Sequence, residues 1–337
     1  MSENKLPRIG VTMGDPAGIG PEIICKSLAD EKVYTVCQPI VIGNASVMQK
    51  AASVVCPNQT VRTISDPSEA TCSPDVINVI DLPLDYEVEP GKMDVGNGRI
   101  AIACMEKVYA LISAGKLDAT ASAPCNKEAM KMAGLPCVGA TEFYAKLSGV
   151  AKSFAVIDQG GCYIFQATSH LALRKAIEKI TPEFIEQTII TSYKTLQQWG
   201  LQTPRIALSA FNPHASDGGS MGREDLDVLT PAIQAASEKL GAEVAGPVPA
   251  DALYIKGMQH VYDGIIFLFH DTANIPVKLI EQYTPSVVIT GGLPFVRTTV
   301  AHGTAYDIAY KGIAGYHQMQ NAILSAATIS ARLMGQN

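Results

Sequence analysis

Short apolar runs that end at Gly, Pro, Asn or His recur along the whole chain, and helix-like patterns follow many of them. This alternation is typical of a largely parallel sheet, because parallel neighbours need a long crossover that is usually a helix. The predicted strands cover residues 8–13, 39–43, 76–81, 117–124, 153–158, 162–170, 205–214, 262–270 and 286–292. The clearest predicted helices cover residues 21–29, 96–114, 181–198, 224–240 and 316–334. The pattern therefore predicts an α/β fold.

Two domains are expected, because nine strands are too many for one small sheet and 337 residues suffice for two cores. No change of composition marks a boundary, which favours domains joined by crossing strands over domains on a flexible linker. The prediction divides the chain into a discontinuous domain of 1–125 with 270–337 and a second domain of 126–269.

Composition excludes several classes of partner. The chain is 47% hydrophobic and 17% charged, with a net charge of −6, which is typical of a compact protein. The sequence has no stripe of Lys and Arg residues of the kind that binds DNA or RNA. The sequence also lacks the run of about 18 apolar residues that would predict a membrane span, and its N-terminus does not resemble a secretion signal. A cytoplasmic protein is the expectation.

Three of the six histidines follow predicted strands: His170 in "YIFQATSH", His214 in "IALSAFNPH" and His270 in "IIFLFH". Since the carboxyl ends of parallel strands meet at one edge of a sheet, these side chains can converge there. Three imidazoles with an open fourth position are a typical catalytic site for zinc or a related divalent ion. The alternative is that each histidine ends its strand in an ordinary hydrogen-bonded turn.

Two charged residues follow the last of these histidines. Asp271 can orient a metal ligand or accept a proton, and Lys278 can hold an anionic substrate or transfer a proton. Both could equally be solvated loop charges. Further on, the glycine-dotted segment 296–315 suits close backbone approach to a ribose or adenine, although it lacks the Gly-x-Gly-x-x-Gly spacing.

The turn "GDPAGIGPE" near the N-terminus is glycine-rich but matches neither a Walker loop nor a dinucleotide fingerprint. Gly18 and Gly20 allow a tight turn, and Pro21 and Glu22 suit the first turn of a helix. Asp15 would repel a phosphate placed against it. The turn is therefore either purely structural or part of the rim of a cofactor cleft.

Six blocks of the sequence, in order and nearly end to end, resemble the 4-hydroxythreonine-4-phosphate dehydrogenase family of vitamin B6 synthesis. The blocks are "MGDPAGIGPEI" (13–23), "SAPCNKEAM" (122–130), "TSHLALRKAI" (168–177), "NPHASDGG" (212–219), "HDTANIPVKL" (270–279) and "GLPFVRTTVAHGTAYDIA" (292–309). The resemblance implies two α/β/α domains like those of isocitrate and isopropylmalate dehydrogenases, with an active-site cleft between them. It makes the discontinuous domain the cofactor side and the other the dimer-forming side.

The resemblance also implies residue roles. His170, His214 and His270 would bind a divalent metal, zinc first and otherwise magnesium, manganese or cobalt, with one histidine supplied by the partner of a homodimer. Asp251, Asp271 and Lys278 match catalytic positions, and Thr141, Lys278 and Arg297 match substrate positions. The residues that match the NAD or NADP site are Gly292, Leu293, Gly303, Thr304 and Asp307. The opening turn would lie beside the nicotinamide.

Four positions depart from the family pattern. Ala140 replaces the histidine of Gly-His-Thr-Glu, and Thr272 stands where His-Asp-Gln-Gly has glutamine. Val288 replaces an asparagine and Ala301 an aspartate. Loss of hydrogen-bonding groups from a polar substrate costs on the order of 1–3 kcal/mol each, enough to redirect specificity. A related substrate such as 4-phospho-threonate or 4-phospho-erythronate is therefore expected.

The expected reaction is oxidation of a 3-hydroxy acid by NAD or NADP at a divalent metal, with decarboxylation of the keto acid. Three alternatives remain: a metal-dependent hydrolase that needs no nicotinamide, a phosphate-ester binding protein or transferase on the same scaffold, and a metal-binding relative that has lost catalysis.

Overall fold

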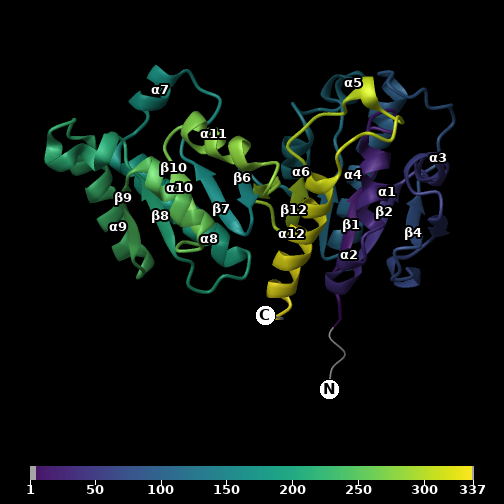
Figure 1. Cartoon of the computed structure of the whole chain (residues 1–337), viewed down its shortest axis with the longest axis horizontal. Helices are drawn as coiled ribbons and strands as arrows, with labels where there is room; N and C mark the ends of the chain where they lie inside the picture. Colours follow the sequence, from purple (N-terminus) through teal and green to yellow (C-terminus); the bar gives the residue numbers. More distant parts are fainter. Residues whose placement is uncertain (1–4, 336–337) are drawn as a thin grey trace. The chain divides into compact units, whose positions relative to one another are not determined.

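A computed structural model describes residues 5–335. These residues form two compact units (Figure 1). Unit 1 comprises residues up to Phe154 and residues from Val287 onward, and unit 2 comprises Ala155–Ser286. Each unit is built around its own run of hydrogen-bonded strands with helices packed against it.

The sheet of unit 1 has the strand order β3-β4-β2-β1-β5-β12-β11. Pairings are parallel except that β12 and β11 run antiparallel. The strands are β1 (Arg8–Thr12), β2 (Gln38–Gly43), β3 (Thr60–Ile64), β4 (Val76–Asp81), β5 (Ala119–Ser122), β11 (Ser286–Gly291) and β12 (Val296–Thr299). Central strands β1, β2 and β5 are almost fully buried, which agrees with the continuous apolar runs expected of parallel strands covered on both faces.

Helices flank this sheet (Figure 1). Helix α4 packs against β1 and β2, while α12 packs against β5, β12 and β1. The helices of unit 1 are α1 (Gly20–Leu28), α2 (Glu31–Val36), α3 (Ala45–Val55), α4 (Val95–Ser113), α5 (Lys127–Met132), α6 (Ala140–Ser148) and α12 (His317–Leu333), with 3-10 turns η1 (Pro67–Glu69) and η4 (Tyr306–Ile308). Asp94 begins α4 by accepting a hydrogen bond from Gly96 N at 2.7 Å.

The strands of unit 2 have the order β6-β7-β10-β8-β9. Only β6 and β7 run antiparallel; the pairs β7–β10, β10–β8 and β8–β9 are parallel. The strands are β6 (Phe154–Gln159), β7 (Cys162–Gln166), β8 (Ile206–Ser209), β9 (Val244–Val248) and β10 (Gly264–Phe267).

Helices cover both faces of these strands. A Cβ on Gly264 would lie 2.7 Å from Leu196 of α8, whereas Ile265 contacts Gly257 of α10. Successive strand residues point to opposite faces, so α8 and α10 lie on opposite sides of β10. The helices of unit 2 are α7 (Leu173–Glu178), α8 (Pro182–Gln198), α9 (Thr230–Leu240), α10 (Ala250–Met258) and α11 (His270–Ile280), with the 3-10 segment η2 (Pro213–Gly219) and the π-helical turn η3 (Asp225–Leu229).

The predicted α/β fold with largely parallel strands is confirmed. Each of the nine predicted strands overlaps a strand of the structure, and the five predicted helices correspond to α1, α4, α8, α9 and α12. Thr181 caps α8 at the start of the predicted range 181–198, with its Oγ1 accepting from Phe184 N at 3.2 Å and Pro182 at the first helical position. Strands β3, β9 and β12 and the remaining helices were not predicted. These three strands are only four or five residues long, and Gly-Pro interrupts β9.

The two units divide after residues 154 and 286, whereas the sequence prediction placed the divisions after residues 125 and 269. The difference has a packing reason: α5 and α6 pack against α4 of unit 1, and α11 packs against β7 and β10 of unit 2. In the described part of the chain, no helix combines the length and the apolar character needed to cross a membrane.

Candidate metal and substrate sites

The three strands that precede the predicted metal ligands are direct neighbours in unit 2. Strand β10 lies between β7 and β8, and both pairings are parallel. His170, His270 and His214 follow the carboxyl ends of β7, β10 and β8 respectively. The topology therefore brings the three histidine-bearing segments to one edge of the same sheet, which is where open α/β sheets bind their ligands.

Two of the histidines lie together. The ring centroids of His170 and His270 are 5.5 Å apart. Nδ1 of His270 lies 2.8 Å from Oδ1 of Asp271, so an Nδ1–H that donates to this carboxylate leaves Nε2 free to bind a metal. Among residues 5–335 of a single chain, no three His, Cys, Asp or Glu side chains form a metal-binding group. One chain thus supplies a pair of imidazoles together with an orienting carboxylate.

His214 occupies a loop with unusual backbone geometry. His214, Ala215, Ser216 and Asp217 have φ values of 54°, 54°, 69° and 43°, and Gly218 continues the run at 65°. Each residue with a side chain costs about 1–2 kcal/mol in this left-handed region. His170 also has a positive φ, of 51°. Strain of this kind is found preferentially at functional sites. The backbone conformation therefore supports a functional role for these two histidines independently of the sequence.

A cavity of about 340 Å³ lies beside the His214 loop. Its lining includes His214, Asp251 from the first turn of α10, and Thr272 from α11. Asp251 is exposed, and a carboxylate next to an imidazole can accept a proton from a bound hydroxyl group. The predicted catalytic residue Asp251 and the predicted ligand His214 therefore line one cavity of unit 2.

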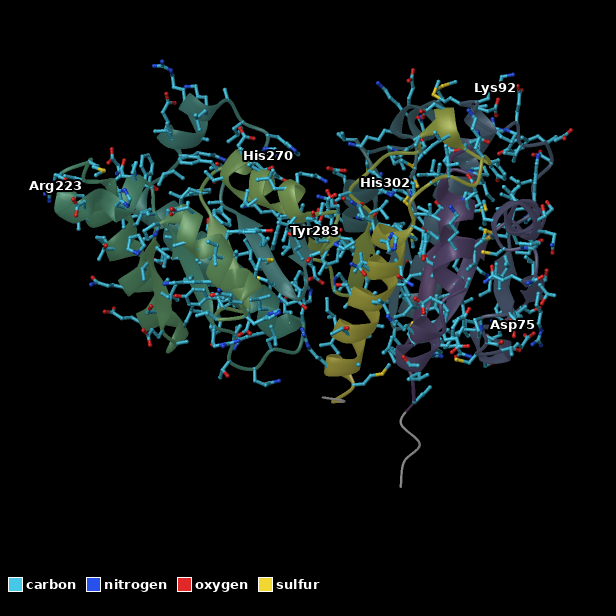
Figure 2. All side chains as sticks on the ribbon, viewed as in Figure 1. Asp75, Lys92, Arg223, His270, Tyr283 and His302 are labelled. Carbon is cyan, nitrogen blue, oxygen red and sulfur yellow. The ribbon has the colours of Figure 1, made fainter. Side chains whose placement is uncertain are left out.

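Lys278 lies two turns beyond His270 on α11 and is exposed (Figure 2 labels His270). Its Nζ is 2.6 Å from Oε2 of Glu281. An exposed ion pair of this kind contributes little to stability and can exchange for another anion. Lys278 is thus available to a carboxylate or phosphate.

Unit 1 buries an arginine that forms no ion pair with any described carboxylate. Arg297 of β12 is 3% exposed, and Nη1 donates to Thr290 Oγ1 at 2.8 Å and to Thr141 Oγ1 at 3.2 Å. Its guanidinium lies 5.0 Å from the ring centroid of Tyr144, and its Nε has no hydrogen-bond partner among the described residues. Burial lowers the pKa of Arg297, but a guanidinium still carries its charge at neutral pH. The predicted substrate residues Thr141 and Arg297 are therefore in contact.

The opening turn holds the predicted cofactor loop in place. A Cβ on Gly18 would lie 2.8 Å from Thr304 O, so only glycine permits this approach. Asp15 is 1% exposed and accepts from Tyr306 Oη at 2.6 Å and from Ala17 N at 2.9 Å. Burial raises the pKa of Asp15 above its ordinary value of 3.8, against the opposing effect of these hydrogen bonds.

Glu22 provides a second connection to the same loop. It is fully buried and accepts from the backbone N–H groups of Tyr310 and Gly312, the latter at 2.7 Å. Lys26, one turn later, donates to the carbonyl oxygens of Gly312 and Ala314, each at 2.8 Å. The acidic residues of the turn thus fix a loop, and the Asp15 carboxylate is occupied by hydrogen bonds from that loop and from the turn itself.

The predicted cofactor residues are all in unit 1. Thr304 is 9% exposed and contacts Gly18, while Gly303 and Asp307 are exposed at the surface of the loop. Gly292 and Leu293 lie between β11 and β12. Gly292 has a φ of 85°, and a Cβ at this position would lie 2.5 Å from the carbonyl oxygen of Lys152. Figure 2 labels His302 in this region, whose Nδ1 lies 2.9 Å from Gly303 O. The loop is fixed at its base and exposed at its tip.

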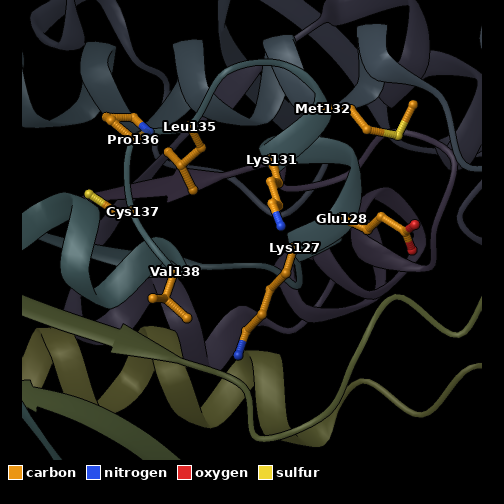
Figure 3. A pocket seen from close by; sticks show the side chains of 8 residues that line it. All are labelled: Lys127, Glu128, Lys131, Met132, Leu135, Pro136, Cys137 and Val138. Atoms are coloured by element: carbon orange, nitrogen blue, oxygen red, sulfur yellow. The ribbon is translucent and has the colours of Figure 1, made fainter.

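Two lysines that the sequence interpretation did not single out line a hollow of about 960 Å³ in unit 1 (Figure 3). Lys127 and Lys131 are one turn apart on α5, and neither forms an ion pair among the described residues. Carbon Cε of Lys127 lies 3.4 Å from a Cβ built on Gly139, which precedes the first turn of α6. The sequence could have pointed to these lysines, because Lys127 lies in the family-like block "SAPCNKEAM" and Lys131 directly follows it.

The four departures from the family pattern have separate locations. Ala140 begins α6 next to Thr141, Val288 lies on β11, and Ala301 follows β12, all in unit 1. Thr272 lies on α11 of unit 2, where its Oγ1 donates to Phe269 O at 2.8 Å. None of these four replaces a predicted metal ligand.

Comparison with known proteins gives a consistent result over nearly the whole chain. Residues 35–326 match the family described as pyridoxal phosphate biosynthetic protein PdxA. The D-threonate 4-phosphate dehydrogenases of Pectobacterium atrosepticum and Cupriavidus necator are both 38% identical, over 96% and 97% of this chain and 99% and 98% of theirs. A crystal structure of 4-hydroxythreonine-4-phosphate dehydrogenase from Klebsiella pneumoniae is 37% identical, covers 97% of this chain and 99% of its own, and has a TM-score of 0.87. The chain therefore belongs to the PdxA family.

Proposed function

We propose that this protein is a metal-dependent, NAD- or NADP-dependent dehydrogenase that oxidises a phosphorylated 3-hydroxy acid and releases carbon dioxide. The observation that carries the proposal is the pairing of His170 and His270 at the ends of adjacent parallel strands, in a chain whose relatives are dehydrogenases. D-threonate 4-phosphate or its erythronate isomer is the proposed substrate class, because relatives named for the threonate compound cover nearly the whole chain.

The residues fit a divalent cation. Imidazole nitrogens suit zinc, and hydrogen bonding of Nδ1 to a carboxylate is the usual support of a metal-binding histidine, as in the His270–Asp271 pair. A cation held there would lower the pKa of a substrate hydroxyl and stabilise negative charge on the oxidised product, while a nicotinamide would accept the hydride. Magnesium, manganese or cobalt could replace zinc at such a site.

A homodimer would complete the metal site. Because His170 and His270 pair within one chain and no third ligand joins them among the described residues of that chain, we assign His214 to the site of a second copy. Ile275, Leu279 and Tyr283, four residues apart along α11 and the turn after it, are 59%, 71% and 79% exposed (Figure 2 labels Tyr283). Large apolar side chains exposed in a row commonly mark a protein interface, and this row begins one turn from His270.

Cationic residues of unit 1 would hold the anionic groups of the substrate. Arg297 is preorganised by two threonine hydroxyls and the Tyr144 ring, and it retains unused donor capacity. A buried guanidinium without a carboxylate partner is best compensated by a bound carboxylate or phosphate. Lys127 and Lys131 add positive charge near the first turn of α6, whose free N–H groups also favour anions.

Asp251 is the proposed base for the substrate hydroxyl. It is exposed to the same cavity as His214, whereas Asp271 is engaged with His270 and is better suited to orienting that ring. Lys278 would hold the substrate carboxylate before its loss and supply a proton to the carbon that carried it. The loop 303–314, fixed by Asp15 and Glu22, would hold NAD or NADP with Gly292, Leu293, Gly303, Thr304 and Asp307.

The test is formation of reduced nicotinamide from D-threonate 4-phosphate, D-erythronate 4-phosphate and 4-hydroxythreonine 4-phosphate, each with NAD and with NADP. We expect absorbance at the reduced-nicotinamide band only after zinc, manganese or magnesium is added to chelator-treated protein. Metal-dependent turnover without nicotinamide reduction would indicate a hydrolase instead. Metal binding without turnover of any phosphorylated or unphosphorylated 3-hydroxy acid would indicate a relative that has lost catalysis.

A further inference from the structure

The loop that presents His214 is held by one buried carboxylate. Asp225, at the start of η3, is 1% exposed. Its Oδ1 accepts from Phe211 N at 2.7 Å, and its Oδ2 accepts from Asn212 N at 3.0 Å and from Ser216 Oγ at 2.5 Å. These donors lie on both sides of His214 along the chain, so Asp225 fixes the loop before and after the histidine.

The loop needs such support. Four consecutive residues with side chains, from His214 to Asp217, occupy the left-handed region that glycine tolerates and other residues avoid. Ser216 is fully buried, and its hydroxyl also accepts from Asn212 Nδ2 at 3.2 Å. The imidazole of His214 itself makes no hydrogen bond among the described residues and is exposed. Its position is therefore set by the backbone alone.

We propose that Asp225 is the positioning residue of the metal site: it holds residues 211–216 in the left-handed conformation that presents His214 to the cation. The inference rests on the proposed metal function and extends it, since Asp225 contacts the loop and not the cation. A carboxylate in this role acts through hydrogen bonds to backbone N–H groups, and its charge near the site is secondary.

Glu224 provides a matched control. It is the neighbouring acidic residue, and its carboxylate accepts from the side chain of Asn212 at 2.8 Å but from neither backbone N–H that Asp225 fixes. Glu224→Gln and Asp225→Asn remove the same charge from adjacent positions. A purely electrostatic role would weaken cation binding equally in both, whereas a positioning role would weaken it only in the Asp225 variant.

The experiment measures zinc affinity of the full chain by competition with a chromophoric chelator at constant pH, alongside the thermal unfolding midpoint. We expect Asp225→Asn to bind zinc about 10–100-fold more weakly than the wild type, as is typical when support of a ligand is lost, and Glu224→Gln to stay within about 3-fold. Ser216→Ala removes one of the three donors and should give an intermediate loss. If Asp225→Asn does not fold, the zinc affinity of Ser216→Ala alone tests whether Asp225 positions His214.

The outcomes separate the two claims. Wild-type zinc affinity in folded Asp225→Asn, with only a lower unfolding midpoint, would overturn the positioning role and leave the proposed metal function intact. Equal losses in Asp225→Asn and Glu224→Gln would overturn it in favour of an electrostatic effect. If the wild type binds no zinc, and no manganese, cobalt or magnesium in its place, the proposed function fails first and the positioning role fails with it.

Discussion

Unit 2 and unit 1 differ in how closely they keep the family's residues. Unit 2 carries all three predicted metal ligands together with one of the four departures described above, Thr272. Unit 1 carries Arg297 and Thr141 but also the departures Ala140, Val288 and Ala301. By the sequence resemblance, the unit proposed to bind the metal thus keeps the expected ligands, while the unit proposed to select the substrate carries most of the departures.

The two units also hold their functional loops differently. In unit 1, Asp15 and Glu22 bond to residues about 290 positions away, which ties the two ends of the chain together. In unit 2, Asp225 bonds to residues 9–14 positions away. Loss of a long-range buried connection should therefore affect global stability, whereas loss of the short-range connection should affect mainly the local geometry of the loop.

The largest effect on stability is expected from Glu22→Ala. It leaves two backbone N–H groups of the 310–312 segment without their buried acceptor and opens a cavity, which together should lower the free energy of unfolding by about 2–4 kcal/mol. Urea unfolding checks this, with the exposed Glu31→Ala as the control, expected to change stability by less than about 0.5 kcal/mol. A loss no larger than the control's would remove the contrast between the two loops.

Arg297→Met tests whether unit 1 holds the anionic part of the substrate. The methionine fills similar space without donors, so KM for the phosphorylated hydroxy acid should rise about 100-fold, with a smaller change in kcat, because a binding interaction common to ground and transition states is lost. The exposed Arg99→Met on α4 is the matched control and should leave KM unchanged. Equal kinetics in the two variants would show that Arg297 is only a structural residue.

Ala140→His restores the family residue at the start of α6. A hydrogen-bonding imidazole next to Thr141 should raise kcat/KM for 4-hydroxythreonine 4-phosphate by about 10-fold, in line with one recovered hydrogen bond. Ala140→Leu adds bulk without a donor and should give no gain. If the histidine variant also gains nothing, the selectivity of unit 1 has diverged beyond this residue.

The smallest effect concerns the pH dependence of Asp15. Its pKa in the folded protein is raised by burial, so its favourable contribution to folding is complete below about pH 3.8 and is lost as the pH rises through the raised value. The free energy of unfolding of the wild type, relative to Asp15→Asn, should therefore fall with rising pH, by no more than about 1.4 kcal/mol per pH unit for one proton. Urea unfolding over a pH series measures the difference. Parallel curves would contradict the burial of an ionisable Asp15.

Much of this arrangement could be predicted from sequence. Strongly apolar strands and the positions of the histidines after them were sufficient to predict that the three histidine-bearing segments share one edge of a parallel sheet. The adjacency of β7, β10 and β8 was not predicted and comes from the structure. Resemblance to the family supplied Thr141 and Arg297, which are indeed in contact.

Other features left no signal in the sequence. The positive φ values of His170 and of residues 214–217 could not be predicted, because few residues other than glycine adopt this conformation and sequence patterns do not mark those that do. In the 214–217 loop, the conformation is accompanied by the hydrogen bonds to Asp225. The pairing of Asp15 and Glu22 with the 306–312 loop is invisible for a similar reason, because it joins segments nearly a whole chain length apart. The role of Asp225 likewise could not be predicted, because it lies between the acidic residues Glu224 and Asp227 and nothing in the sequence distinguishes it from them.

The most direct test of the central claim is zinc content in mixed dimers. Wild-type protein should retain about one zinc per chain after gel filtration, and His170→Ala and His214→Ala alone should retain almost none. A heterodimer of these two variants, isolated with two different affinity tags, would contain one intact site if His214 acts in the partner's site, so we expect about one zinc per two chains. Full zinc content in either single variant, or none in the heterodimer while the wild type binds zinc, would contradict the account.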